Sequence, residues 1–182
     1  MGIVDHIRAF RADLGRYRQG ATGPIEVLEA QGVWATAVYR YGQWVYASRR
    51  GVVGVPLKIG YRVMHKAIEV TTGISVPASV RAGDGLYIGH FGQIIVHPDV
   101  KAGRNLSIGQ GVTIGARGGG RGGVPVIGDD VYIGVGAKVL GAIHIGDGVR
   151  IGANAVVIDD VPSNTTVVGI PARPVRSKEG AP

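Results

Sequence analysis

The stretch IGDDVYIGVGAKVLGAIHIGDGVRIGANAVVIDDV, residues 127–161, repeats a pattern every six residues. Each hexad opens with one aliphatic residue, and these residues are Ile127, Ile133, Val139, Ile145, Ile151 and Val157. A small or apolar residue follows four positions later in every hexad. An uninterrupted repeat of this kind indicates an architecture in which each repeat is one structural unit. The pattern predicts a β-solenoid with a short strand and a turn per hexad and three hexads per triangular coil.

The aliphatic residue of each hexad is expected to point inward and to stack on its equivalent in the next coil. The glycine that often follows it is expected to free the corner for an unusual φ angle. The same frame extends upstream, through Val76, Ala82, Ile88, Val96, Ala102, Ile108 and Ile114. The predicted fold class is therefore mainly β, a parallel β-helix over residues 73–170.

Residues 1–72 show a different period. Apolar residues at Val27, Trp34, Val38, Tyr41 and Val45 keep intervals of three, four or seven, as on one face of a helix. We therefore expect an N-terminal helical region over residues 1–72, followed by the solenoid domain. Residues 171–182 are expected to form a C-terminal tail.

Two irregularities break the solenoid frame. In LYIGHFGQIIV, residues 86–96, the interval from Ile88 to Val96 is eight residues instead of six. The second break is a glycine-rich loop, residues 116–125, between Ile114 and Ile127. A regular stack tolerates insertions only at its corners, and long excursions from a strict repeat are common places for function. His90 lies in the first break and is the candidate catalytic residue.

The composition excludes several classes of protein. The chain has 182 residues, no cysteine and 32 glycines, and the glycines show no collagen period. Thiolate metal sites and disulfides are thereby excluded, and a reducing cytoplasm is expected. The sequence contains no apolar run of about 18 residues and its start does not resemble a signal peptide, so we expect no membrane span. The net charge of +7 suits an anionic ligand, whereas a single RGGGRGG tract does not indicate a nucleic-acid partner.

Several motifs together resemble one family of enzymes. They are ATAVYRYGQWVY (35–46), GHFGQIIV (89–96), VTIGARGGG (112–120), GVPVIGDDVYIGVGAKVLG (123–141) and VVGIPARPV (167–175). In these motifs the chain resembles the serine acetyltransferases and the related O-acetyltransferases of polysaccharide gene clusters. The resemblance implies a left-handed β-helix, acetyl-CoA as co-substrate and no metal. It also implies a homotrimer, with a hexamer left open, and active sites between neighbouring coils.

The resemblance implies a role for several residues. His90 corresponds to the general base that takes the proton from an acceptor hydroxyl, a role that suits imidazole chemistry. Asp13 is the candidate for acceptor binding. Coenzyme A would follow the backbone of the later coils. The candidate cofactor-binding residues are Ala116, Arg117, Val135, Arg173 and, from its charge alone, Lys138.

The chain also departs from the family pattern. Ile74 stands where the family has the aspartate that orients the base, and Gly89 stands where an aspartate precedes the histidine. Gly123 and Val124 replace an Arg-His pair that helps to bind the amino-acid acceptor. A zwitterion needs charged partners at fixed positions, so L-serine and a sugar hydroxyl of a glycan both stay open as acceptors. Thr72 and Gln110 share the corner of His90 and are candidates to orient its ring.

Two other classes of function are alternatives. One is a non-catalytic trimeric scaffold, in which His90 would have no chemical role. The other is a metal hydratase of the γ-type carbonic anhydrase class, which needs three histidines around one zinc ion. His90, His97 and His144 do not match the histidine spacing of that class.

Overall fold

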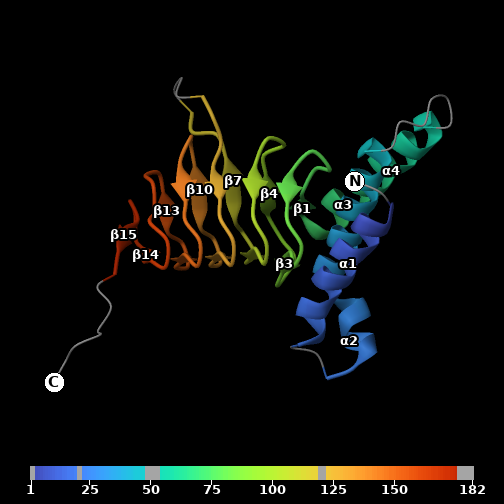
Figure 1. Cartoon of the computed structure of the whole chain (residues 1–182), viewed down its shortest axis with the longest axis horizontal. Coiled ribbons are helices and arrows are strands. Elements are labelled where there is room, and N and C mark those ends of the chain that lie inside the picture. The colour runs from blue at the N-terminus through green and yellow to red at the C-terminus, as the bar shows by residue number, and fades with distance from the viewer. Residues whose placement is uncertain (1–2, 20–21, 48–53, 119–121, 176–182) are drawn as a thin grey trace.

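The computed structural model describes residues 3–19, 22–47, 54–118 and 122–175. Helices stand against one end of a solenoid of short strands (Figure 1). The helices are α1 (Ile3–Arg18), α2 (Pro24–Glu29), α3 (Gln31–Ala47) and α4 (Gly54–Thr72). The strands of the first coils are β1 (Ile74–Ser75), β2 (Arg81–Ala82), β3 (Tyr87–Ile88), β4 (Ile94–Val96), β5 (Lys101–Ala102), β6 (Ser107–Ile108) and β7 (Thr113–Gly115). The later strands are β8 (Val126–Ile127), β9 (Tyr132–Ile133), β10 (Lys138–Leu140), β11 (His144–Ile145), β12 (Arg150–Ile151), β13 (Val156–Val157), β14 (Thr166–Val168) and β15 (Arg173–Pro174).

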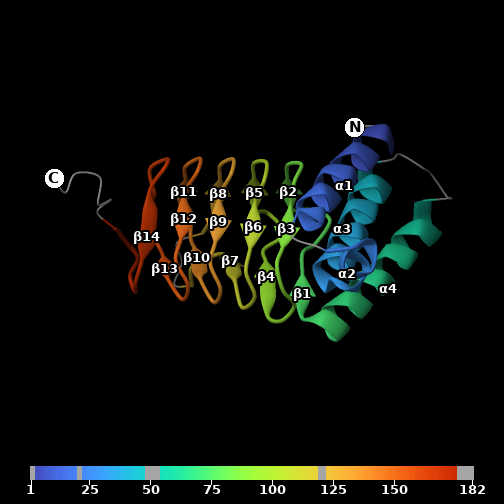
Figure 2. The same cartoon turned by 90° about the horizontal axis from the view of Figure 1, so that it is seen from below.

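The strands form three sheets, which are the three faces of a prism. Sheet A has the order β1-β4-β7-β10-β13, sheet B the order β2-β5-β8-β11, and sheet C the order β3-β6-β9-β12-β14-β15. From β1 to β14 consecutive strands belong to different sheets, whereas β15 returns beside β14 in sheet C as the one antiparallel neighbour among these strands. Figure 2 shows the coils stacked side by side along the long axis of the molecule. The six-residue repeat therefore predicted this part of the fold correctly.

The register between coils explains why the repeat is aliphatic. In sheet C, Ile88 pairs with Ile108, Ile108 with Ile133, and Ile133 with Ile151. These four side chains are buried inside the prism. Each coil alone would expose this face to water, so burial against the next coil is what stabilises the stack.

The glycine that follows many of the aliphatic residues has a different role from the one expected. Gly134 is not among the residues with positive φ, which fall two positions later, at Gly136 and at the equivalent Asp130 and Asn154. A Cβ atom on Gly134 would lie 2.7 Å from the carbonyl oxygen of Ile151 and 2.8 Å from the amide nitrogen of Ala153. Glycine is needed there because the backbone of the next coil leaves no room for a side chain.

Side chains from the helices cover the open end of the solenoid. The first coil has no preceding coil to pair with, and an unpaired strand edge is a site for aggregation. Tyr39 donates a hydrogen bond to the carbonyl of Val80 (3.0 Å) and accepts one from the amide of Ala82 (3.1 Å). Tyr61 accepts one from the amide of Ala78 (2.8 Å). We call α1–α4 the helical cap because they satisfy this edge.

A buried ion pair joins the helical cap to the same coil. Arg40 Nε donates to Asp13 Oδ2 at 2.7 Å, and its Nη2 donates to Asp13 Oδ1 at 3.0 Å. Asp13 Oδ1 also accepts from the amides of Gly85 and Leu86, each at 2.8 Å. Both charged side chains are almost fully buried. The pair fixes the helices on the coil that leads into β3 and His90.

No helix within the described ranges is long and apolar enough to cross a membrane.

Candidate active site

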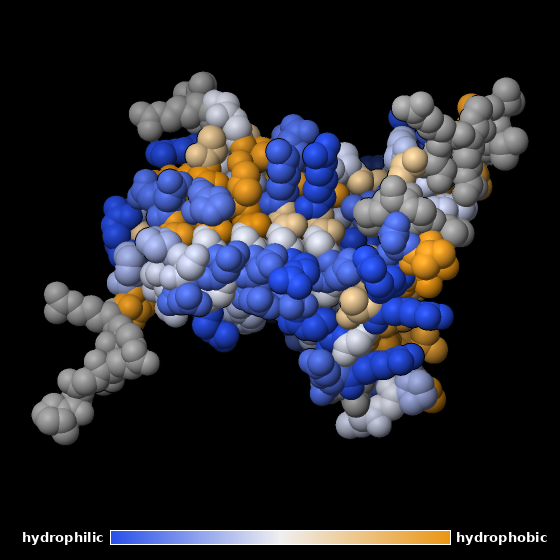
Figure 3. All heavy atoms as spheres, in the orientation of Figure 1, coloured by the Kyte–Doolittle hydropathy of each residue, from blue (hydrophilic) through white to orange (hydrophobic). Residues whose placement is uncertain are grey.

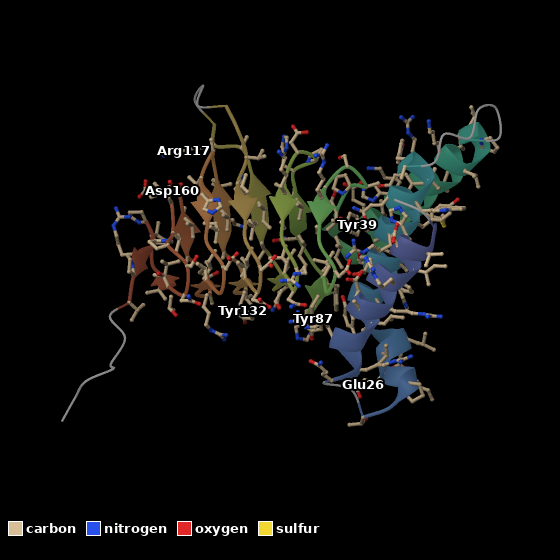
Figure 4. All side chains as sticks on the ribbon, in the orientation of Figure 1. Glu26, Tyr39, Tyr87, Arg117, Tyr132 and Asp160 are labelled. Atoms are coloured by element: carbon tan, nitrogen blue, oxygen red, sulfur yellow. The ribbon has the colours of Figure 1, made fainter. Side chains whose placement is uncertain are left out.

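A pocket of about 420 Å³ lies between the helical cap and the corner that follows β3. Its wall on the cap side comes from α1, α2 and the start of α3, and its wall on the solenoid side comes from Tyr87, Gly89, His90 and Phe91. Figure 4 shows Tyr87 and Glu26 at the lower edge of the molecule, where helix and solenoid meet. His90 is exposed here and does not face the interior of the prism.

The extra residues of the first break form an irregular corner. Gly92 and Gln93 have φ angles of 103° and 52°, and the amide of Gly92 donates to the carbonyl of Thr72 at 2.8 Å. The corner therefore stays attached to the chain at the end of α4 although it departs from the repeat. Buried Ile94 and Val96 restore the solenoid pattern directly afterwards. The two additional residues thus leave the core intact and place His90 on the surface.

Two tyrosines support the strand that precedes this corner. The hydroxyl of Tyr17 accepts a hydrogen bond from the amide of Ile88 at 3.0 Å, and its ring lies 4.8 Å from the ring of Tyr87. Burial raises the pKa of Tyr17 to about 12, so this phenol stays neutral at physiological pH. Tyr17 therefore acts as an anchor between α1 and β3 and not as an acid or base.

Neither residue expected to orient the His90 ring does so. Thr72 Oγ1 donates to the carbonyl of Ile68 at 2.7 Å and accepts from the amide of Ile74 at 3.2 Å. Gln110 Oε1 is buried and has no hydrogen-bond partner within the described residues. The same part of the chain supplies no hydrogen bond to the His90 ring.

Two carboxylates in this pocket were not predicted from the sequence. Glu26 and Glu29 both come from α2 and line the same pocket as His90. Glu26 Oε2 accepts hydrogen bonds from the amide (2.7 Å) and the hydroxyl (2.9 Å) of Thr22. The bond from the amide of Thr22, and to a smaller extent the bond from its hydroxyl, lower the pKa of Glu26. Glu26 is therefore ionised at neutral pH. The threonine four residues before Glu26, near a helix start marked by Pro24, was the available sequence signal.

The predicted cofactor residues lie on two separate edges of the prism. Val135 lies on the same edge of the prism as His90. Backbone hydrogen bonds connect the corners along this edge, from the amide of Gly111 to the carbonyl of Gly92 and from the amide of Gly136 to the carbonyl of Gln110. Ala116 and Arg117 follow β7 at a different edge, and Figure 4 shows Arg117 on the side of the solenoid opposite Tyr87 and Tyr132. A single chain therefore does not bring these groups together. Residues 119–121 of the predicted loop, and residues 176–182 of the predicted tail, lie outside the described part of the chain.

The two remaining cationic candidates are engaged within the chain. Lys138 Nζ donates to the carbonyl of Gly111 at 2.5 Å and to Thr113 Oγ1 at 3.1 Å. Arg173 lies on β15 and forms an exposed ion pair with Asp159 at 3.1 Å. The Arg173 pair is exposed to solvent, so a phosphate could replace the carboxylate at little cost.

The structure gives Asp13 a different position from the one expected. Its side chain is completely buried, and both carboxylate oxygens already accept hydrogen bonds from Arg40 and from the first coil. In this position the carboxylate is not accessible to a ligand. Asp13 instead has a structural role, because its hydrogen bonds connect α1 to α3 and to the first coil of the solenoid.

The described part of the chain contains no group of three histidine, aspartate or glutamate side chains placed to hold a metal ion. The hydratase alternative therefore finds no candidate zinc site among these residues.

Comparisons with known proteins agree with the repeat pattern. Residues 125–159 match the family model described as bacterial transferase hexapeptide, six repeats. The serine acetyltransferase of Mycobacterium tuberculosis is 32% identical over an alignment of 182 positions, which covers 97% of this chain and 76% of that protein. The chain belongs to the serine acetyltransferase family. Its solenoid is accordingly a left-handed parallel β-helix.

Other members of the family match over part of their length. The serine acetyltransferase of Synechococcus elongatus is 38% identical over 143 residues, and the match covers 78% of this chain but only 56% of that relative. Among solved structures, the Brucella abortus serine acetyltransferase in complex with coenzyme A has a TM-score of 0.82 at 29% identity, over 95% of this chain and 68% of its own. The Neisseria gonorrhoeae enzyme in complex with serine has a TM-score of 0.79 at 30% identity, over 96% of this chain and 70% of its own.

Proposed function

We propose that this protein transfers the acetyl group of acetyl-CoA to an acceptor hydroxyl, with His90 as the general base. The observation that carries the proposal is the irregular corner, which places one exposed imidazole in a pocket next to two carboxylates. The family membership supports it, since related serine acetyltransferases have been solved with coenzyme A and with serine. The absence of cysteine fits a reaction in the reducing cytoplasm.

In the proposed reaction His90 takes the proton of the acceptor hydroxyl while the hydroxyl oxygen attacks the thioester carbonyl. The tetrahedral oxyanion then collapses, the carbon–sulfur bond breaks, and the imidazolium returns the proton to the leaving thiolate. The products are the O-acetyl ester and free coenzyme A. General base catalysis of this kind contributes roughly 10²–10⁴ in rate.

L-Serine is the first candidate acceptor. Glu29 and the ionised Glu26 stand in the pocket of His90 and would attract the ammonium group of an amino acid. Neither Asp13 nor the positions that depart from the family pattern would be required for this contact.

A sugar hydroxyl is the second candidate, and the lining of the pocket favours it. No lysine or arginine is among the described lining residues, so a single chain offers no cation to the carboxylate of serine. Tyr87 and Phe91 present aromatic rings, and Glu26 and Glu29 present hydrogen-bond acceptors for hydroxyl groups. An apolar ring face beside carboxylates suits a carbohydrate.

Coenzyme A is proposed to bind between two copies of the chain. Val135 and Lys138 would line it on the edge of His90, while Ala116 and Arg117 would reach it from the opposite edge of a neighbour. Closed cyclic symmetry repeats one such contact between every pair of neighbours, and three prisms make a homotrimer. Arg173 would exchange Asp159 for the nucleotide end of the cofactor.

The acceptor is tested by following release of free thiol from acetyl-CoA, with L-serine and a panel of sugars offered separately. Serine turnover well above that of every sugar supports the first candidate, and the reverse result supports the second. No acetyl transfer to any hydroxyl would favour the non-catalytic scaffold.

The shared site is tested by mixing two inactive variants. His90→Ala removes the base from one edge, and Ala116→Trp blocks the other edge. Co-expressed chains would form some sites that have both edges intact, so activity should reappear in the mixed assembly. Failure of every mixture, with each variant folded and assembled, would contradict a site shared between copies.

A further inference from the structure

A second groove lies on the outer face of sheet C, beside the C-terminal end of α1. Its volume is about 500 Å³, and its lining combines two arginines, Arg16 and Arg150, with the carboxylate of Asp130. The side chains that follow one another along this face, on β3, β6, β9 and β12, are those of Tyr87, Ser107, Tyr132 and Arg150. None of the described residues that line the groove also lines the pocket of His90. The reaction proposed above therefore gives the groove no role.

Each of the two arginines lies over a tyrosine of sheet C. The guanidinium carbon of Arg16 is 5.8 Å from the centre of the Tyr87 ring, and that of Arg150 is 5.0 Å from the centre of the Tyr132 ring. Such contacts orient a guanidinium without using its N–H groups in ordinary hydrogen bonds. The two cations of the groove are therefore held in place while donors stay available to a ligand.

The hydrogen bonds of this cluster leave several donors free. Arg16 donates from Nη1 to the carbonyl of Gly85 at 3.2 Å and from Nη2 to Ser107 Oγ at 2.9 Å, which uses two of its five N–H groups. Arg150 makes no hydrogen bond or ion pair with any residue that the structure describes. Ser107 is only 8% exposed, and its hydroxyl donates to none of the described residues. The groove thus offers charged and neutral donors to a ligand that carries acceptors.

The rest of the lining favours a sugar that carries an acidic group. Asp130 Oδ1 accepts a hydrogen bond from Asn105 at 2.8 Å, and its second oxygen is available to the hydroxyl groups of a ligand. A phosphate polymer would meet this carboxylate with repulsion, because its binding depends on cations along the groove. Among the described lining residues Val131 is the one aliphatic side chain, and it is buried, so the groove offers little to a lipid. An acidic sugar has acceptors for the arginines, donors for Asp130 and a ring face for the exposed Tyr132.

The groove continues the pocket of His90 along the same face. Tyr87 lines that pocket, and Arg16, which lies over the Tyr87 ring, lines the groove. Tyr132 is two strands away from Tyr87, which corresponds to roughly 10 Å, and Figure 4 shows both at the lower edge of the molecule. The two prism edges proposed to hold coenzyme A both border sheet A. Neighbouring copies would therefore leave the groove on sheet C open to an extended acceptor.

We propose that this groove binds the acidic sugar of a glycan acceptor while another sugar of the same molecule occupies the pocket of His90. The inference rests on the proposed acetyl transfer and names an anionic oligosaccharide as its acceptor class. The carboxylate of the acidic sugar would accept hydrogen bonds from Arg16 and Arg150. Its ring would stack on Tyr132, and its hydroxyls would donate to Asp130. The pocket of His90, which contains two carboxylates, would hold a neutral sugar.

The test is isothermal titration calorimetry of the full chain with the hyaluronan tetrasaccharide, in which glucuronate alternates with a neutral N-acetylated sugar, and with its methyl ester. We expect the acid to bind roughly fivefold more tightly than the ester, the size of effect that an exposed ion pair gives. In Arg150→Gln this ratio should fall to about two, because Arg16 remains. Arg81→Gln, at an exposed position of β2 in sheet B, removes the same charge from another face and should keep the wild-type ratio.

Tyr132→Ala provides a second variant with a different expected result. It removes the ring but not the charges, so it should weaken binding of the acid and the ester alike, by roughly fivefold. Equal binding of acid and ester to the wild type, no binding of either at millimolar concentration, or an equal effect of Arg81→Gln would overturn the proposal. Tighter binding of an oligouridylate that is also weakened in Arg150→Gln would overturn it as well, because the groove would then favour a nucleic acid.

The titrations contain no acetyl-CoA and are therefore independent of the proposed reaction. Binding as expected supports the acidic-sugar site even if no acceptor is acetylated, in which case the proposed reaction alone is contradicted. In thiol-release assays with the tetrasaccharide, Arg150→Gln should raise KM and leave kcat unchanged. Acetylation of serine or of single sugars but not of the bound tetrasaccharide would leave the proposed reaction in place and overturn the groove as an acceptor site.

Discussion

The solenoid and the helical cap reach stability by different means. In the solenoid each position of the hexad has one requirement, which every coil repeats, such as an aliphatic side chain at Ile133 and no side chain at Gly134. In the cap, single contacts that occur once hold the structure, above all the buried pair of Asp13 and Arg40. Figure 3 shows hydrophobic and polar residues in bands over the solenoid and in scattered patches over the helices. The candidate active site lies where these two regions meet.

From this difference we predict that breaking an ion pair of the cap lowers the free energy of unfolding more than breaking an ion pair of the solenoid. Arg40→Met should lower the free energy of unfolding by about 3–5 kcal/mol, because it leaves Asp13 as an uncompensated buried charge. Arg104→Met breaks the exposed pair with Asp129 and should cost less than about 1 kcal/mol. Urea unfolding of both variants measures the contrast. Equal losses would show that the cap does not depend on its buried pair.

The second prediction concerns glycines. Replacing a glycine should destabilise the solenoid but stabilise the helical cap. Gly134→Ala should destabilise the solenoid by roughly 1–3 kcal/mol, because the new Cβ meets the backbone of the next coil. Gly15→Ala in α1 meets nothing within 4 Å and should stabilise the chain by roughly 0.5–1 kcal/mol. Thermal unfolding of the two variants should therefore shift in opposite directions. A neutral Gly134→Ala would contradict the close approach of the coils.

The third effect appears only at alkaline pH. Burial raises the pKa of Tyr39 from about 10 to about 12, so the folded state favours the neutral phenol. Its contribution to stability is complete below pH 10 and is lost as the pH rises toward 12. Stability measured from pH 9 to pH 12 should fall less steeply in Tyr39→Phe than in wild type. Tyr132→Phe, an exposed position on the solenoid, should follow the wild-type curve.

The two regions also differ in how far sequence predicts them. The solenoid follows from the repeat because the residues that stack are related by a constant interval, as with Ile133 and Ile151. The role of its glycines was misjudged, since sequence shows where glycine occurs and not whether φ or space requires it. Gly134 is required because a side chain would not fit, whereas Gly136 has a positive φ angle.

The cap could not be predicted to the same depth. Asp13 and the amide of Gly85 are 72 residues apart, and no periodicity links them. For the same reason the sequence did not place Glu26 and Glu29 in the pocket of His90, although His90 itself was marked by the break in the repeat. Val135 and Arg117 lie at different edges of the prism, and the sequence alone does not show which edges two copies of the chain bring together.

The central claim is that the irregular corner exists to present His90 to the acceptor, and one kinetic comparison tests it. Thiol release from acetyl-CoA should be measured for wild type, His90→Ala and His144→Ala, with the best acceptor found for the wild type. The account predicts a loss of kcat of about 10²–10⁴ in His90→Ala and no change in His144→Ala. Wild-type turnover by a folded His90→Ala variant would contradict it.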